Sequence, residues 1–452
     1  MADVRPLPGI RYAPETDLAA VVTPPYDVIS PEAQARYYTR DPHNIIRLEL
    51  GRDEPGDDGL NNRYTRAALT FAEWRLSGVL RQDKPGLYLY EQRFSVPGVG
   101  GARKRRGLFA RVRLVPWEEG VILPHERTLS KPKDDRLKLT RATSATLSPI
   151  MALYDDPSGE LTALLGKAAR RKPEVAFTDE AGEEHRLWPL RDEALIARVE
   201  DFFRDRQLYI ADGHHRYETA LAYREELRET RRDLAPNDAA NFTLMALSAL
   251  EDPGLVVLPT HRIVRGVAPE RLSVFRDDLA AYFEASPLGE PGGLATLDVA
   301  ETLATLTAAS EDGQRVAFVM VTADGAFLLR QTAAGEAAMD ALDSARAGEH
   351  IGDSAAWRRL DVTSLHELIL ARGLGVSERM VRAGEGIAYT RDASAAIEAV
   401  RAGVDGAQLA FLLNPTPPTA IRDVARAGDR MPQKSTYFYP KLITGLVINP
   451  LW

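Results

Sequence analysis

The chain of 452 residues contains no cysteine, which excludes disulfide bonds, a thiol nucleophile and any metal site built on thiolates. It also has no hydrophobic run near the ~20 residues that span a bilayer. Residues 1–15 lack the apolar segment of a secretory signal. The absence of cysteine fits a reducing compartment. We therefore expect a soluble, cytoplasmic protein without a membrane partner.

Several familiar catalytic motifs are also missing. There is no G-x-x-x-x-G-K-[ST] phosphate loop, no kinase-type glycine loop with its partner motifs, no G-x-S-x-G and no H-E-x-x-H. Positive charge is not in excess, because 57 Lys and Arg face 65 Asp and Glu, a formal net charge of −8. This balance disfavours a protein that mainly coats nucleic acid, although it leaves room for a local basic site.

What is present is the composition of an ordinary globular protein, 44% hydrophobic and 27% charged. Strand-like and helix-like segments are intermixed, which predicts an α/β or α+β fold. The composition changes near residue 266, after which the chain is rich in Ala, Leu and Glu. We therefore expect one domain over 1–265 and a second α/β domain over 266–452. The final segment, 430–445, is dense in hydrogen-bond donors and could return to the site of the first domain.

Apolar periodicity gives the main expected elements. Helical spacing covers 62–77, and alternation over 86–96 and 105–115 predicts an antiparallel strand pair. The intervening basic stretch, 97–106, is expected to be a solvated loop rather than a phosphate clamp. A second strand pair is expected over 315–321 and 324–330, turning at Asp324-Gly325.

Residues 208–220, LYIADGHHRYETA, form the most informative stretch. They predict a short strand, a tight turn at Asp212-Gly213, and a helix that begins with His214, His215 and Arg216. The first N–H groups of a helix lack intrahelical partners and carry partial positive charge, so these side chains favour an anion, phosphate above all. The alternative is a solvated helix cap. The adjacent histidines would face apart, which disfavours a zinc site built on both.

A second candidate lies in residues 123–141, LPHERTLSKPKDDRLKLTR. His125, Glu126 and Thr128 occupy a proline-bounded loop, where a carboxylate beside a histidine can act as a general base toward a hydroxyl. Lys133 and Arg136 follow at a predicted helix start and could neutralise phosphoryl charge. The alternative is a solvated run of charges.

Two further segments supply candidate substrate contacts. His261 and Arg262 interrupt an apolar strand end, where a structural histidine is the alternative. In the segment 430–445 we choose Lys434 and Ser435, because two prolines fix this loop as a binding surface. Asp27, in a proline-bounded loop near the start, is interpreted as ordering a turn.

The chain resembles an uncharacterised family, domain of unknown function 1015, over nearly its whole length. The motifs that carry the resemblance are PPYDVIS (24–30), LPHERTLSKPKDDRLKL (123–139), YIADGHHRYETA (209–220), LPTHRIV (258–264), LDVTSLHELIL (360–370) and MPQKSTYFYPKLITGLV (431–447).

The DGHHR segment also resembles the ParB/sulfiredoxin superfamily and its free-serine kinases. This likeness implies a ParB/sulfiredoxin-like mixed-sheet core. It implies that Gly213, His214, His215 and Arg216 bind nucleotide phosphates, with Asp212 near the reacting phosphate or a metal. It further implies Glu126 as the base toward a serine hydroxyl, and a link to serine metabolism.

Three functions follow as hypotheses. The first is phosphoryl transfer from ATP or ADP with Mg²⁺ to a small hydroxyl metabolite, in which His125, His214 and Asp212 would assist Glu126. The second is hydrolysis of a small phosphomonoester such as phosphoserine, with a histidine as nucleophile or acid. The third is a non-enzymatic, ParB-like nucleotide- or nucleic-acid-binding module, which the acidic charge and the lack of a helix-turn-helix signature disfavour.

Overall fold

The computed structural model describes residues 1–452 except 97–98, 127–129, 231–233, 291–292, 312–314 and 343–353. The chain divides into two compact units. Unit 1 contains Met1–Pro124, Thr128–Val256 and Tyr439–Trp452, and unit 2 contains His125–Arg127 and Val257–Phe438. We expected a boundary at residue 265. The chain instead leaves unit 1 after Val256, and its last fourteen residues belong to unit 1 again.

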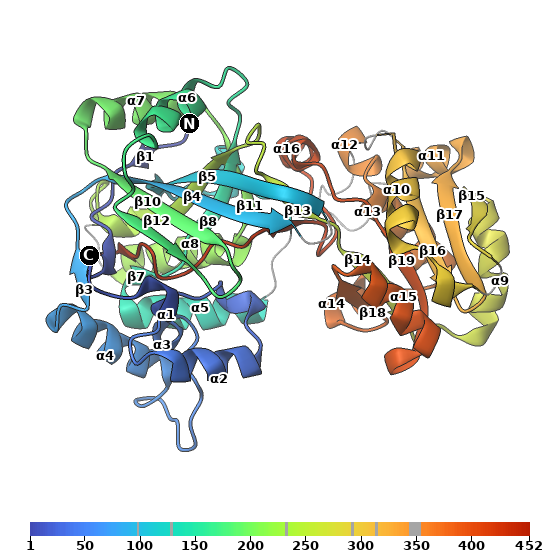
Figure 1. Ribbon diagram of the computed structural model, residues 1–452, viewed down its shortest axis with the longest axis horizontal. Coiled ribbons are helices and arrows are strands. Elements are labelled where there is room, and N and C mark those ends of the chain that lie inside the picture. Colours follow the sequence, from blue (N-terminus) through green and yellow to red (C-terminus); the bar gives the residue numbers. More distant parts are fainter. Residues whose placement is uncertain (97–98, 127–129, 231–233, 291–292, 312–314, 343–353) are drawn as a thin grey trace. The chain divides into compact units, whose positions relative to one another are not determined.

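A mixed sheet forms the centre of unit 1 (Figure 1). The order of its described strands is β6-β11-β8-β12-β5-β4-β10-β9, with β1 beside β5. β11 runs parallel to β6 and β12 parallel to β8, whereas the other neighbours are antiparallel. β8 and β12 are buried along their whole length, as expected of central strands covered on both faces. The bounds are β1 (Val4–Arg5), β4 (Leu87–Val96), β5 (Val99–Arg113), β6 (Ile122–Leu123), β8 (Ile150–Tyr154), β9 (Val175–Thr178), β10 (Glu184–Leu190), β11 (Leu208–Asp212) and β12 (Phe242–Ala249).

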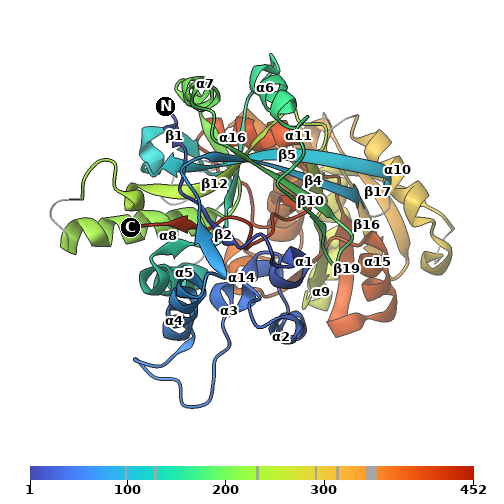
Figure 2. The same ribbon diagram turned by 60° about the vertical axis from the view of Figure 1, so that its left-hand side comes forward.

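Helices cover both faces of this sheet. α6 (Glu160–Ala168) and α7 (Glu193–Phe203) lie over one face, and α5 (Ser130–Thr143) and α8 (His214–Thr230) lie on the other (Figures 1 and 2). Leu161, Val199 and Phe203 bury their side chains in the main core of the sheet. The other α-helices in the described part of unit 1 are α1 (Leu18–Val21), α2 (Pro31–Arg40), α3 (Ile46–Glu49) and α4 (Arg63–Leu76).

Two short strand pairs also belong to unit 1. β2 (Ile10–Tyr12) pairs with β3 (Leu80–Gln82), and β21 (Asn449–Pro450) pairs with β7 (Ala145–Thr146). The last pairing fixes the end of the chain beside α5, because β7 directly follows that helix. β13 (Val256–Leu258) and β20 (Tyr437–Tyr439) lie where the chain passes from one unit to the other.

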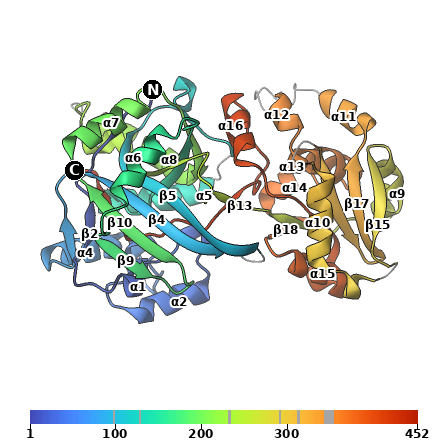
Figure 3. The same ribbon diagram turned by 45° about the horizontal axis from the view of Figure 1, so that its top comes forward.

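Unit 2 is built on an antiparallel sheet in the order β15-β17-β16-β19-β14-β18. α10 and α15 pack on one face of it, where Leu306, Ala396 and Val400 meet the buried residues of β16 and β19 (Figure 3). The strands are β14 (His261–Arg265), β15 (Phe283–Leu288), β16 (Ala317–Thr322), β17 (Gly325–Gln331), β18 (Ile387–Thr390) and β19 (Ala407–Leu412). The helices are α9 (Pro269–Ala280), α10 (Val299–Ala309), α11 (Ala333–Asp340), α12 (Ala355–Arg358), α13 (Asp361–Ser364), the π-helix η5 (Leu365–Gly373), α14 (Glu378–Ala383), α15 (Ala393–Ala402) and α16 (Pro418–Arg426).

The expected α/β class is confirmed, as are the helix at 63–76 and the antiparallel pairs β4–β5 and β16–β17. Ser30 caps α2 by accepting a hydrogen bond from the Ala33 N–H. The solvated basic loop was wrong: β5 begins at Val99, and Arg105 within it is 2% exposed. No helix in the described part of the chain is long and apolar enough to cross a membrane.

Candidate functional site

The predicted strand–turn–helix at DGHHR is present in unit 1. β11 ends at Asp212, Gly213 turns the chain with φ +95°, and α8 begins at His214. A side chain at 213 would also collide, because a Cβ there would lie 2.9 Å from Cζ and Nε of Arg216. Two features therefore favour glycine at position 213: the left-handed backbone conformation and the close approach of the Arg216 guanidinium.

Asp212 is held between two cations. Nη2 of Arg216 lies 2.5 Å from Oδ2 of Asp212, and the Lys441 ammonium donates to Oδ1. Nη1 of Arg216 donates to the carbonyl of Pro149. Burial alone would raise the pKa of Asp212, but the charges of Lys441 and Arg216 outweigh it and hold this pKa well below its ordinary value. The three charges leave one positive charge in excess at the N-terminus of α8.

Lys441 is placed by a buried network around its own backbone. Arg105 donates to the carbonyl of Pro440 at 2.6 Å and to the Gln92 side-chain oxygen. Nε2 of Gln92 in turn donates to the Lys441 carbonyl at 3.1 Å. Arg105, in the basic stretch on β5, thus has a structural role, because its guanidinium binds the C-terminal segment of the same chain.

Sequence reasoning missed Lys441, although it singled out the donor-rich segment 430–445. It chose Lys434 and Ser435, which belong to unit 2, whereas Lys441 belongs to unit 1 with the turn. The lysine is separated from Asp212 by 229 residues, so no local spacing could reveal the pair.

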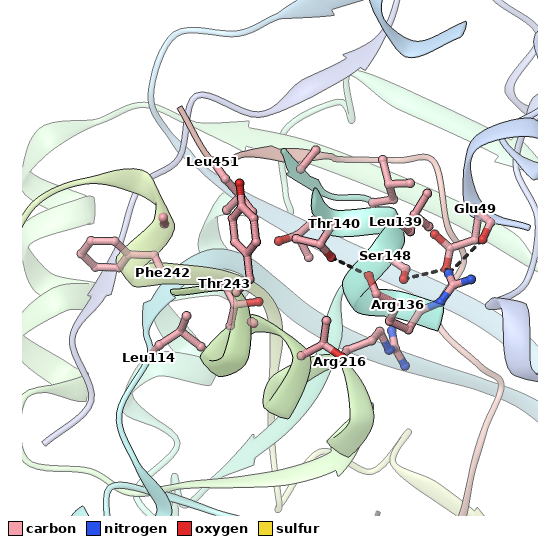
Figure 4. Close-up of a pocket in the computed structure, with 17 residues that line it drawn as sticks. Glu49, Leu114, Arg136, Leu139, Thr140, Ser148, Arg216, Phe242, Thr243 and Leu451 are labelled. Atoms are coloured by element: carbon pink, nitrogen blue, oxygen red, sulfur yellow. Dashed lines mark hydrogen bonds and ion pairs between the residues drawn. The ribbon is translucent and has the colours of Figure 1, made fainter. Parts of the chain in front are cut away.

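A second buried ion pair lies close to the turn (Figure 4). Nη1 of Arg136 is 3.4 Å from Oε1 of Glu49, and the Ser148 hydroxyl donates to the same oxygen at 2.9 Å. Burial raises the pKa of Glu49, and the charge of Arg136 acts against that rise. Arg136 and Arg216 line one cavity of about 40 Å³, which is room for a water molecule.

Two other groups complete the description of unit 1. Lys133 forms an ion pair with Glu218 of α8 at 2.8 Å, so its charge ties α5 to α8. Asp27 lies in the 3₁₀ helix η1 (Tyr26–Val28), is exposed, and its charge contributes to the raised pKa of the buried Arg216. The neighbouring Tyr26 carries the Arg136 guanidinium over its ring, with Cζ 4.0 Å from the ring centroid.

The other predicted site residues that the structure describes belong to unit 2. Nε2 of the buried His125 lies 3.0 Å from the Thr436 hydroxyl, and Oε1 of Glu126 accepts a hydrogen bond from the Lys434 N–H at 3.0 Å. Thr128 lies outside the described residues. The structure therefore joins His125 and Glu126 to the segment 431–436, while the DGHHR turn contacts Lys441.

His261 and Arg262 are both buried on β14. Nδ1 of His261 accepts from the Leu413 N–H at 3.2 Å, and burial lowers its pKa to about 4, so the ring is neutral near pH 7. Nη2 of Arg262 donates to the Lys434 carbonyl at 3.1 Å. The Ser435 hydroxyl donates to the Pro432 carbonyl. The bond between His261 and the Leu413 N–H is the kind of contact that a structural histidine makes, and its role in substrate binding stays a prediction.

Within the described residues, one group of three side chains has the spacing to hold a metal ion: Asp179, Glu183 and His185, whose ligand atoms lie within 4.8 Å of one another. Nε2 of His185 is 3.1 Å from Oδ2 of Asp179, and the Tyr90 hydroxyl is 2.7 Å from Nδ1. Asp212, our candidate metal residue, is not in this group. Its two carboxylate oxygens are already paired with the side chains of Arg216 and Lys441.

Comparison with known proteins decides the family. The model for the protein family of unknown function DUF1015 matches residues 4–363. The chain belongs to this family. No curated protein matches it.

Solved structures similar to this DUF1015 member are distant. A conserved hypothetical protein from Pyrococcus furiosus is 11% identical, with a TM-score of 0.34 over 76% of this chain and 97% of that one. A free serine kinase in complex with AMP is 11% identical, with a TM-score of 0.33 over 75% and 92%. SbnI from Staphylococcus aureus, truncated at its C-terminus, is 11% identical, with a TM-score of 0.32 over 76% and 87%.

Proposed function

We propose that the turn 212–216 binds the phosphates of ATP or ADP and that the protein transfers a phosphoryl group to a small hydroxyl metabolite, with serine as the first acceptor to test. The observation that carries the proposal is the Asp212 carboxylate fixed between Arg216 and Lys441 at the start of α8. Phosphoryl transfer needs positioned positive charge more than it needs covalent chemistry from the protein.

The parts of the turn have different roles in this proposal. Arg216 is buried and engaged on two sides, so it is a positioning residue that orients Asp212 and shapes the turn. The N–H groups of Gly213, His214 and His215 and the dipole of α8 supply the phosphate cradle. Lys441, whose ammonium reaches Asp212 from the C-terminal segment, adds the excess charge.

In this reaction the oxygen of the acceptor hydroxyl bonds to phosphorus while the bond from phosphorus to the leaving phosphate breaks. A carboxylate must accept the proton that the hydroxyl loses. Glu126 remains our candidate from sequence, beside His125 in unit 2. Asp27 is a second candidate, because it is exposed in unit 1 and acts electrostatically on Arg216.

The described residues of the turn do not fit a protein-held Mg²⁺. Both oxygens of Asp212 are engaged by cations, and Mg²⁺ prefers carboxylate oxygens and water in octahedral geometry. A magnesium ion would therefore arrive on the nucleotide phosphates. We assign none of the protein steps to it.

The test is calorimetric titration with ADP and ATP of the wild type, Lys441→Met and the control Lys172→Met, an exposed lysine of unit 1. We expect binding to the wild type and the control, and loss of at least tenfold in affinity for Lys441→Met. Equal affinities of all three proteins would show that the nucleotide does not bind at the turn 212–216. Phosphate release from phosphoserine without nucleotide would assign a phosphatase instead.

A further inference from the structure

Unit 2 contains a large pocket that the proposed function does not use. Its volume is about 580 Å³, within the range of small-molecule sites. The lining comes from β14, from α10, from α12 and α13, and from the loop and first turn of α16, and it includes Arg262, Ser310, Arg359, Asp361, Asn414 and Thr419. All of these residues belong to unit 2.

Arg262 is the unusual member of the lining. It is 1% exposed, and within the described ranges no carboxylate forms an ion pair with it at 4.0 Å or less, although the charge of Glu126 acts on it from farther away. Its Nη atoms donate to the carbonyls of Thr260 and Lys434, while Nε has no hydrogen-bond partner. A buried guanidinium is normally paired, because an uncompensated charge in the interior is costly.

A helix end points to the same kind of ligand. Thr419 and Ala420, in the first turn of α16, line the pocket. The N-cap position, Pro417, provides no side-chain hydrogen bond to the first N–H groups of this nine-residue helix. Pro418 has no N–H group and the Ala420 N–H donates to the Pro417 carbonyl at 3.0 Å, so the Thr419 N–H and the positive end of the helix dipole are the features that favour an anion here.

The remaining charges of the lining do not cancel this preference. Asp423 is paired with Arg422 at 2.8 Å, and Arg359 is exposed with its positive charge in the lining. Burial raises the pKa of Asp361 to about 7, so near neutral pH this carboxyl opposes an anion less than an ordinary aspartate would.

We propose that this pocket, which we call the Arg262 pocket, binds a small anionic metabolite through a carboxylate or phosphate group held by Arg262 and the N-terminus of α16. Arg presents a planar fork of N–H donors that suits either oxyanion. The inference goes beyond the proposed function and does not depend on it, since every residue it uses lies in unit 2.

The experiment uses the full chain carrying Lys441→Met, so that the turn of unit 1 contributes little anion binding. Inorganic phosphate and succinate are titrated separately, and the midpoint of thermal unfolding is followed, because a ligand of the folded state raises it. We expect one of the two anions to raise the midpoint, which also identifies the preferred head group. No rise with either anion at high millimolar concentration would overturn the proposal.

Three further substitutions, each made in the Lys441→Met chain, test whether the anion binds in the Arg262 pocket. Arg262→Gln should weaken the bound anion at least tenfold. Thr419→Glu adds a carboxylate where a helix N-terminus tolerates it, so the fold is kept while the anion is repelled. Thr419→Lys at the same exposed position should strengthen binding. An anion response that is equal in Thr419→Glu and Thr419→Lys would place the anion elsewhere and refute the Arg262 pocket.

Discussion

The ammonium group of Lys441 and the carboxylate of Asp212 form a partly buried ion pair across 229 residues of the chain. Arg216 holds the second oxygen of the same carboxylate. The DGHHR turn is therefore completed by the C-terminal segment, and its charge depends on residues from two segments of unit 1 that lie far apart in the chain. Four predictions follow from this site and its surroundings.

Replacing Arg216 with Gln should destabilise the protein strongly. The change leaves Asp212 with one partner and removes a donor from the Pro149 carbonyl, and breaking a buried ion pair costs about 3–5 kcal/mol. Urea unfolding measures the loss. Arg228→Gln, on the same helix but half-exposed, should change the free energy of unfolding by less than about 1 kcal/mol. Similar losses for both would show that the Asp212 pair adds little stability.

Gly213→Ala tests the close approach of the guanidinium. Ala must adopt φ +95° and place its Cβ 2.9 Å from Arg216. Gly182→Ala is the matched control, because φ is +80° there and no atom lies within 4 Å of the added Cβ. The control should lose about 1–2 kcal/mol from backbone strain alone. Gly213→Ala should lose more and should also weaken ADP binding. Losses that match the control would mean that Arg216 shifts without consequence.

Asp27→Asn and Glu126→Gln separate the two candidate bases. The variant that removes the base should lower the rate of phosphoryl transfer by about 10²–10⁴-fold, while its affinity for ADP is kept. Rates come from transfer of labelled phosphate to serine and affinities from calorimetry. If both variants transfer phosphate at the wild-type rate, neither carboxylate is the base.

Glu183 should make stability depend on pH near neutrality. Burial and the charge of Asp179 raise its pKa to about 7 from the model-compound value of 4.5. Between these values the folded state keeps a proton that the unfolded state releases, so stability falls as the pH rises through this window, by up to about 3 kcal/mol. Glu183→Gln cannot ionise and should be less sensitive to pH. The neighbouring Glu184→Gln should retain the wild-type profile, and a flat wild-type profile would contradict the prediction.

Local patterns foretold those parts of the site that are local. The strand, turn and helix of LYIADGHHRYETA follow from an apolar run, a glycine and a helix start within a few residues. The alternation of β4 and β5 was equally legible. What the DGHHR residues do could not be read the same way: Arg216 was expected to face a ligand, and the structure buries it against Asp212 and Pro149.

Long-range pairings set the rest. A run of four basic residues looks like a solvated loop in the sequence. The acceptors of Arg105, the Gln92 side chain and the Pro440 carbonyl, come from other segments of the chain, so the local pattern does not show that this residue is buried. The same reason hides Lys441. For Arg262 the sequence indicated a role in binding, but only the fold places it in a pocket with the start of α16. Whether Glu126 acts at the DGHHR turn remains a prediction.

The position of Lys441 late in the chain has a consequence for synthesis. A ribosome completes Asp212, Arg216 and the whole of unit 2 before it adds Lys441, so a nascent chain carries the Asp212–Arg216 pair without the second cation. Arg105 is likewise buried only once the carbonyl of Pro440 is available to receive it. The excess charge that would attract a phosphate therefore appears only after residue 441 has left the exit tunnel, and any fragment that ends earlier lacks it.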